Sequence, residues 1–350
     1  MTRLALKILL LGALLLAINL ALAPLLPYPW GQPPLRAKID FWRQHADAID
    51  TFFLGSSWTY RQLSPQVFDR AWGRGSRSFN FGADGVFFPQ IPLLLEHFDH
   101  QGARPKLWVV ELSRMLTAVD PDLGAAREEK YWLSPDTTAA MLRALFERPD
   151  KSFPQKLLQG ALLAEQLAER AFHLGLGADA GEYWRSPEAE KRWLGPARDG
   201  FYPVELQVEE EKGETFANAF LSDPAAARRL AELLEEGREA FANHRWPAPS
   251  QEHLREARKL IKKAEARGAR LLFLVPPRLG RRYDLLLPVA RALPPENVLL
   301  ELADPRLHPE LYDLELTIDY THLNRRGAEL YSRQLAEVLR ERGLVVPASR

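Results

Sequence analysis

Two short segments of the sequence carry the residue types of a serine nucleophile and its base. The first is the apolar run 52–57, Phe-Phe-Leu-Gly-Ser-Ser, and the second, near the C-terminus, is the run 319–322, Asp-Tyr-Thr-His. A hydroxyl at a strand end, a histidine base and a carboxylate that orients the histidine are the three parts of a serine-hydrolase site. The two segments together therefore predict nucleophilic acyl transfer, with Ser57, His322 and Asp319 as the catalytic residues.

Each segment alone has an ordinary explanation. Ser56 and Ser57 could merely satisfy the hydrogen bonds of a turn. Asp319 and His322 could be solvated residues beside a helix N-cap. However, a spacing of three residues lets the carboxylate accept a hydrogen bond from one ring nitrogen while the other nitrogen faces the nucleophile. The combination of the two segments, and neither one alone, favours the catalytic interpretation.

The elements that must position these residues form an alternating pattern. Short apolar runs typical of buried strands occur at 49–54, 77–81, 107–112, 271–275 and 298–302. Helical periodicity lies between them and continues to the end, as at 91–98, 252–267 and 324–342. This alternation predicts an α/β fold of three αβα layers around a doubly wound sheet of five parallel strands. Sites in such sheets form at the carboxyl ends of strands, where Ser57 is expected.

The domain organisation follows from where the alternation breaks. We expect residues 49–117 and 251–350 to form the α/β core, and residues 118–250 to form a mostly helical insertion without strands. Residues 27–48 are predicted to be a proline-rich linker and a short helix. The insertion contains the aromatic residues Trp184, Trp193, Phe201 and Tyr202. These side chains could line a polysaccharide groove by stacking on sugar rings, or they could pack in a core.

The N-terminal segment 1–26 is predicted to cross a membrane. Arg3 and Lys7 precede an uncharged run from Ile8 to Leu26 in which Asn19 is the sole polar side chain. A helix of that length spans roughly 28 Å, close to the thickness of a bilayer core. Ala21-Leu22-Ala23 would also fit a signal-peptidase site, but the following proline suits cleavage poorly, so we favour an uncleaved signal anchor. The positive charges predict a single-pass protein of the cytoplasmic membrane with its catalytic domain on the extracytoplasmic side.

Composition excludes several classes of function. The chain of 350 residues has no cysteine, which rules out disulfides, zinc–thiolate sites and a cysteine nucleophile. Basic and acidic residues balance at 46 each, so no nucleic-acid partner is expected. Among the histidines other than His322, only His97 and His100 have a spacing that could ligate a metal, and a solvated helix face explains that pair better. We therefore expect neither a metal nor an organic cofactor.

The ordered motifs resemble the SGNH (GDSL-type) hydrolase superfamily over roughly residues 50–115 and 270–340. The Gly-Ser-Ser run matches that family's Gly-Asp-Ser block with serine in place of aspartate, which makes Ser57 the nucleophile. The run 80–85, Asn-Phe-Gly-Ala-Asp-Gly, has the spacing of the second block. The resemblance implies that the amides of Gly85 and Ser57 form the oxyanion hole. It also implies a flavodoxin-like fold, with Asp319 and His322 as the family's Asp-x-x-His block.

One block of the family pattern is missing. The family's third strand is followed by Gly-x-Asn-Asp, whose asparagine donates to the oxyanion, whereas this chain reads Glu-Leu-Ser-Arg-Met at 111–115. Ser113 or Arg114 could replace that donor, and the loss of one such donor typically costs about 10²–10³ in rate. The resemblance thus leaves two hypotheses open: an active site of reduced rate, or a degenerate domain kept as a binding or assembly partner.

The N-terminal anchor and the long insertion are similar to exported branches of the superfamily, including the D-alanine transfer protein and the alginate O-acetyltransferases. This similarity implies a serine esterase or O-acyltransferase that acts on an acylated surface polysaccharide or polymer beside a membrane-bound acyltransferase. In the degenerate alternative, the domain would instead be a partner of that membrane acyltransferase complex.

Overall fold

The computed structural model describes residues 2–22, 33–73, 75–117, 131–173, 189–212, 219–243, 246–278 and 280–344. The chain divides into two units. One consists of Met1–Arg36 and Thr117–Glu190, and the other of Ala37–Leu116 and Lys191–Arg350. The second unit contains the sheet and all the predicted catalytic residues.

The sheet has five strands, all parallel, in the order β2-β1-β3-β4-β5. Their bounds are Thr51–Leu54 (β1), Ser78–Asn80 (β2), Leu107–Glu111 (β3), Arg270–Leu274 (β4) and Val298–Leu299 (β5). Each lies within a predicted run or overlaps it, but β5 is shorter than predicted because Glu301–Ala303 form a 3₁₀ helix. The order reverses between β1 and β3, which is the switch point where doubly wound sheets form their crevice.

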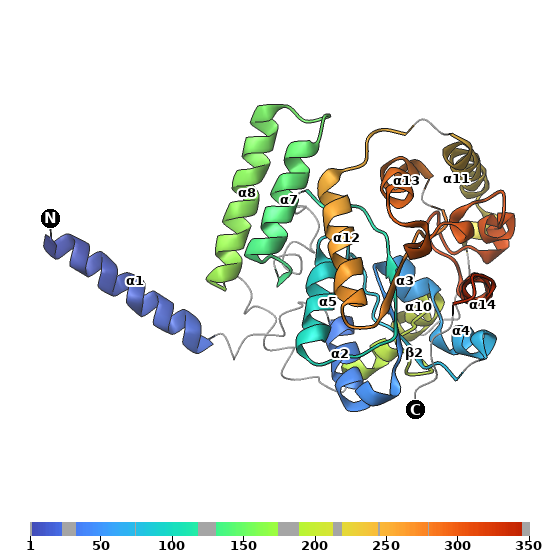
Figure 1. Ribbon diagram of the computed structural model, residues 1–350, viewed down its shortest axis with the longest axis horizontal. Coiled ribbons are helices and arrows are strands. Elements are labelled where there is room, and N and C mark those ends of the chain that lie inside the picture. The colour runs from blue at the N-terminus through green and yellow to red at the C-terminus, as the bar shows by residue number, and fades with distance from the viewer. Residues whose placement is uncertain are drawn as a thin grey trace. The chain divides into compact units, whose positions relative to one another are not determined.

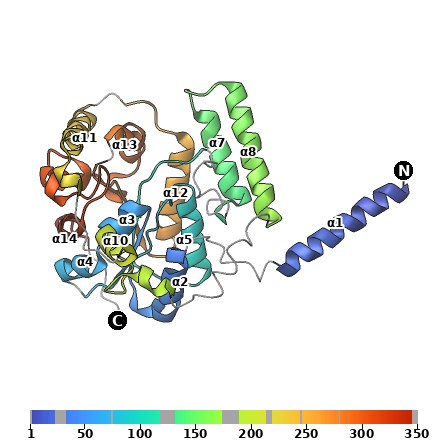
Figure 2. The same cartoon turned by 180° about the vertical axis from the view of Figure 1, so that it is seen from behind.

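Helices cover both faces of this sheet, as Figures 1 and 2 show. Helices α2 (Pro33–His45), α5 (Gln90–His100) and α12 (Gln251–Glu265) lie on one face, and α4 (Pro65–Trp72) and α14 (Arg325–Glu341) on the other. Phe52 of β1 packs against Trp42 of α2 and Phe98 of α5. Its neighbour Phe53 packs edge-on against Phe68 of α4, with ring centroids 5.1 Å apart. Successive side chains of β1 thus enter opposite cores, which explains the unbroken apolar run.

Side-chain caps fix where the helices next to the site begin. Ser64 caps α4, with Pro65 at its first position, and Asn324 caps α14 by accepting a hydrogen bond of 3.0 Å from the Gly327 amide. Both caps satisfy amides that the first helical turn leaves free. The start of α14 fixes the position of the residues just before it, Asp319 to His322.

Four further helices of the sheet unit are α3 (Ser57–Gln62), α10 (Val204–Lys212), α11 (Pro224–Ala242) and α13 (Tyr283–Ala292). The described part of residues 118–250 contains no strand, as predicted. These residues do not form one body, however, because those from Lys191 onward belong to the sheet unit.

The other unit contains α1 (Thr2–Leu22), α7 (Pro135–Glu147) and α8 (Phe153–Ala171). Within the described residues, the stretch Arg3–Ala21 of α1 is the one helix long and apolar enough to cross a membrane, and none of it is buried. Most of the predicted proline-rich linker lies outside the described residues. The short helix predicted after it is α2, and its Lys38 and Trp42 are buried in the sheet unit.

Candidate active site

The three predicted catalytic residues form one chain of hydrogen bonds at the carboxyl end of the sheet. Ser57 is the first residue of α3, directly after β1, and its Oγ lies 2.9 Å from Nε2 of His322. Nδ1 of the same ring lies 2.8 Å from Oδ2 of Asp319. The other candidate serine, Ser56, points elsewhere and donates to Glu111. The geometry therefore selects Ser57 as the hydroxyl that faces the base.

Asp319 is held as an ionised acceptor. Its Oδ1 accepts hydrogen bonds from the amides of Thr321 and His322 at 2.6 and 2.8 Å. Partial burial raises its pKa, but the hydrogen bond and charge of His322 and these two amides outweigh that effect and bring the pKa of Asp319 to about 2. An ionised carboxylate can only accept, so His322 carries its proton on Nδ1 and leaves Nε2 free to accept from Ser57.

Glu111 fixes the turn that contains Ser56 and Ser57. It was not among the site residues predicted from the sequence. This buried carboxylate at the end of β3 accepts from the Ser56 amide at 2.9 Å, from the Ser56 hydroxyl, and from the Thr59 hydroxyl at 3.0 Å. A Cβ on Gly55 would lie 2.1 Å from Thr59 Oγ1 and 2.5 Å from Glu111 Oε2, so only glycine fits there. Burial raises the pKa of Glu111 to about 7. An acidic residue inside an otherwise apolar strand is the sequence feature that could have indicated this role of Glu111.

The loop after β2, which contains Gly85, is fastened to α3 by polar side chains. The Asn80 side chain donates to the carbonyls of Thr59 and Leu63, both at 2.7 Å, and accepts from the Gly82 amide at 2.8 Å. Buried Lys38 donates to the Gly82 carbonyl at 2.6 Å. This loop is therefore fixed relative to the helix that begins with Ser57.

Two backbone amides are candidates for the oxyanion hole. Gly85 is exposed and adopts φ +73°, a conformation that favours glycine. No hydrogen bond to its amide or to that of Ser57 is present within the described part of the chain. Amides at the first turn of a helix are ordinarily free, so the Ser57 N–H is available to an oxyanion.

The two possible replacements for the missing asparagine lie in different environments. Ser113 is fully buried and its Oγ accepts from the Phe88 amide at 3.0 Å. Arg114 is exposed, with its guanidinium carbon 5.0 Å from the centre of the Phe87 ring. Of the two, Arg114 is the one whose donors can reach solvent.

A second arginine lies near the nucleophile helix. The Arg282 guanidinium carbon is 5.3 Å from the centre of the Trp58 ring, and Trp58 directly follows Ser57. Partial burial and the positive charge of Arg114 lower the pKa of Arg282. Among the described residues, neither Arg114 nor Arg282 forms an ion pair with a carboxylate. Two cationic groups thus lie near the end of the sheet where Ser57 is found.

Arg278 positions the segment that carries Asp319 and His322, and it was also missed. It is fully buried after β4, adopts φ +71°, and donates to the carbonyls of Leu311 and Asp313 at 2.6 and 3.0 Å. It also donates to the Thr317 hydroxyl. Burial lowers the pKa of Arg278 to about 10, so the guanidinium stays charged near neutral pH. The sequence feature that could have indicated this role is a charged residue directly after an apolar strand and two prolines.

The aromatic residues of the insertion do not form a common groove in the described structure. Tyr202 is 1% exposed and stacks on Tyr60, while Phe201 is 8% exposed. Trp193 is half-buried and meets the Tyr202 ring edge-on at 5.8 Å. The groove interpretation is therefore wrong for Tyr202, because its ring is buried against Tyr60 of α3. Phe201 is buried as well, at the wall of a separate hollow that Pro203 and Arg325 also line. Trp184 lies outside the described residues.

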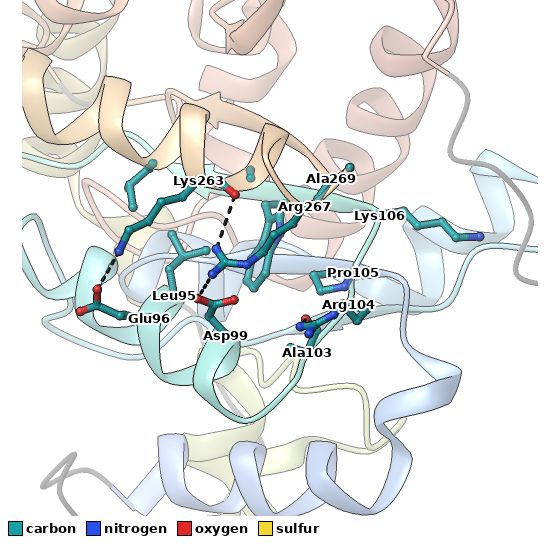
Figure 3. A pocket seen from close by; sticks show the side chains of 14 residues that line it. Leu95, Glu96, Asp99, Ala103, Arg104, Pro105, Lys106, Lys263, Arg267 and Ala269 are labelled. Atoms are coloured by element: carbon teal, nitrogen blue, oxygen red, sulfur yellow. Dashed lines mark hydrogen bonds and ion pairs between the residues drawn. The ribbon is translucent and has the colours of Figure 1, made fainter.

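A small hollow of about 110 Å³ lies at the opposite edge of the sheet, before β3 and β4. Ion pairs between Lys263 and Glu96 and between Arg267 and Asp99 bridge α12 and α5 across it (Figure 3). Because it lies at the amino ends of the strands, this hollow is separate from the catalytic residues. Within the described residues, no group of three or more His, Asp or Glu side chains could hold a metal ion.

No model of a known protein family matches this chain, and no curated protein matches it significantly. What the protein does is therefore inferred from the chemistry of the site.

Proposed function

We propose that this chain is a serine-dependent acyl ester hydrolase or O-acyltransferase of the SGNH type, acting on a cell-surface polymer outside the cytoplasmic membrane. The observation that carries the proposal is the hydrogen-bonded chain from Ser57 through His322 to Asp319. The order of the strands is compatible with the flavodoxin-like arrangement of that superfamily.

The proposed reaction has two steps. Ser57 Oγ attacks the ester carbonyl while His322 Nε2 takes its proton, and the tetrahedral intermediate then expels the alcohol, which receives that proton from His322. The resulting acyl-serine is attacked by water or by a polymer hydroxyl, again with His322 as base. Asp319 remains ionised throughout and stabilises the positive charge that His322 acquires. The amides of Ser57 and Gly85 donate to the oxyanion.

The intact hydrogen-bonded chain favours an enzyme over a degenerate binding partner. Each of its donors and acceptors is engaged in the order that catalysis requires, and the supporting residues Glu111 and Asn80 are buried and satisfied. A domain that only bound a partner would have no need of this arrangement. The absent asparagine donor is instead expected to lower the rate.

The surroundings of the site favour an anionic polymer as substrate. Arg114 and Arg282 lie near the helix that begins with Ser57 and form no ion pair with a carboxylate among the described residues, and they could attract carboxylate or phosphate groups. The apolar helix α1 would hold the enzyme at the membrane, with the positive charges of Arg3 and Lys7 in its first two turns keeping the N-terminus inside.

The test uses the full-length protein in detergent, a short activated ester such as 4-nitrophenyl acetate, and a fluorophosphonate serine probe. We expect slow turnover and labelling in the wild type, and a loss of at least about 10³-fold in kcat in Ser57→Ala and His322→Ala. Ser222→Ala and His308→Ala are matched controls that should retain activity. If the wild type shows no turnover, no labelling and no acyl transfer to any polymer, the binding-partner hypothesis is the better one.

A further inference from the structure

We infer that the α7–α8 hairpin has a second membrane-contacting surface, the exposed apolar face of α8, which rests on the bilayer beside the anchor helix α1. This inference depends on α1 being a membrane anchor and is independent of the proposed catalytic activity. We define the α8 face as Phe153, Leu157, Ala161, Ala164 and Ala168, together with Phe146 of α7 and Phe172 after α8.

The four large side chains of the α8 face, Phe146, Phe153, Leu157 and Phe172, are between 46% and 64% exposed, and its three alanines are exposed too. Outside α1, the other large apolar side chains exposed in the described structure are Leu158 and Leu162, on a neighbouring side of α8, and four that are dispersed in the sheet unit: Leu221, Leu285, Leu307 and Tyr320. Exposed apolar residues are ordinary when scattered, but a contiguous cluster marks a contact surface. The α8 face is such a cluster.

The cluster follows from how α8 packs. Helices α7 and α8 lie side by side (Figures 1 and 2), and of the residues of α8 only Leu163 is buried. Exposed apolar residues recur along the helix at 153, 157, 161, 164 and 168, which is the spacing of one helical face. Glu165 borders this face. The hairpin therefore supplies only part of the burial that such a helix requires.

Contacts at the tip of the hairpin, at the start of α8, form part of the face. The rings of Phe146 and Phe153 meet at a centroid distance of 6.4 Å, and Lys156 reaches away to donate to the Phe146 carbonyl at 2.9 Å. The basic side chain is thus bound to the hairpin, and the two aromatic rings extend the apolar surface from α8 onto α7.

The anchor helix identifies the membrane as the occupant of this face. Asn19, the sole polar side chain of the uncharged run in α1, donates to the Ala171 carbonyl at 2.9 Å and pairs with the His173 ring. These bonds place the end of α8 beside the end of the apolar span of α1, where a bilayer meets water. A helix at that level with one apolar side matches an interfacial amphipathic helix.

The experiment uses the full chain with a single introduced cysteine, which is selective because the native sequence has none. Ala161→Cys carries an environment-sensitive fluorophore, and the protein is reconstituted in phosphatidylethanolamine–phosphatidylglycerol vesicles that contain nitroxide-labelled lipid. We expect a blue shift and quenching at position 161. The same label at exposed Gln101→Cys of the sheet unit should show neither.

Two charge variants of the labelled protein form a matched pair. Leu157→Glu adds a charge to the α8 face and should abolish the quenching, whereas Gln155→Glu adds the same charge to the same turn and should leave it, because glutamate can still accept in the capping box with Ser152. Helical circular dichroism checks that both variants fold. Three results would overturn the inference: failure of the chain to float with vesicles, an unquenched label on a chain that floats, or disulfide cross-linking between copies through position 161, which would assign the face to a second copy.

Discussion

At the scale of single residues, the Asp319 carboxylate determines which nitrogen of His322 carries the proton. Replacement by asparagine keeps the shape but allows the wrong tautomer. We expect Asp319→Asn to lower kcat by about 10³–10⁴ with little change in KM, because the carboxylate acts on the transition state and not on substrate binding. Ester turnover measures this effect, and Asp284→Asn at the exposed start of α13 is the control. Retention of activity within about tenfold would show that Asp319 does not orient the base.

Glu111 makes stability depend on pH. Its pKa of about 7 lies above the ordinary value of 4.5, so the folded state holds the proton more tightly than the unfolded state. The contribution of this group to the free energy of unfolding is therefore highest below about pH 4.5, falls as pH rises, and levels off above about pH 7. The total change is about 3 kcal/mol.

Glu111→Gln removes this titration while keeping the size of the side chain. We expect the wild type to lose stability relative to Glu111→Gln between pH 5 and pH 8, as measured by urea unfolding in detergent with tryptophan fluorescence. Glu232→Gln, which changes a carboxyl group at the surface of α11, should follow the wild-type profile. If the difference in unfolding free energy between the wild type and Glu111→Gln stayed constant across this pH range, the prediction would be contradicted.

At the scale of elements, Arg278 joins the segment after β4 to the loop that leads into Asp319. Arg278→Met fills similar volume but leaves the carbonyls of Leu311 and Asp313 without their donor. Each buried group left unsatisfied costs about 1–3 kcal/mol. We therefore expect the free energy of unfolding to fall by about 3–5 kcal/mol, and the activity to fall by a larger relative amount. Unfolding and ester turnover are measured together. Arg306→Met, which breaks an arginine–aspartate pair with a half-exposed guanidinium, should cost at most about 1 kcal/mol.

The sheet and its main helices could be predicted because their signals are local. Apolar runs ending in glycine or proline mark β1 and β4, and caps such as Asn324 mark helix starts. Helix α3 was not predicted because six residues are too few to show a period, and α13 carries Pro288 in its interior, which reads as a break.

The pairing of Ser57 with His322 could be predicted, but its supporting residues could not. Glu111 contacts Ser56 across 55 positions, and Arg278 contacts Leu311 across 33. Such contacts depend on which strands are neighbours, which residue spacing does not encode. The burial of Tyr202 has the same origin, because its partner Tyr60 lies on a distant segment.

At the scale of the whole molecule, we expect α1 to determine at which membrane surface the proposed site works. The apolar stretch Arg3–Ala21 is long enough to cross a bilayer core. We expect the full-length chain to remain with membranes through high salt and alkaline carbonate and to be extracted by detergent, since apolar burial is insensitive to screening. Leu10→Arg with Leu14→Arg should weaken insertion, because each central charge costs about 2.5–3.5 kcal/mol. Release of a soluble species that begins at Pro24 would show a cleaved signal instead.

The side of the membrane on which the sheet unit lies can be measured separately. The chain has no cysteine, so Thr2→Cys and Gln101→Cys each provide one reactive group, at the start of α1 and in the sheet unit respectively. In sealed right-side-out vesicles we expect an impermeant maleimide to label position 101 and not position 2, because positive charges such as those of Arg3 and Lys7 favour the inner side of the membrane. Detergent should expose both positions. Labelling at position 2 alone would place Ser57 and His322 in the cytoplasm and would exclude a surface polymer as their substrate.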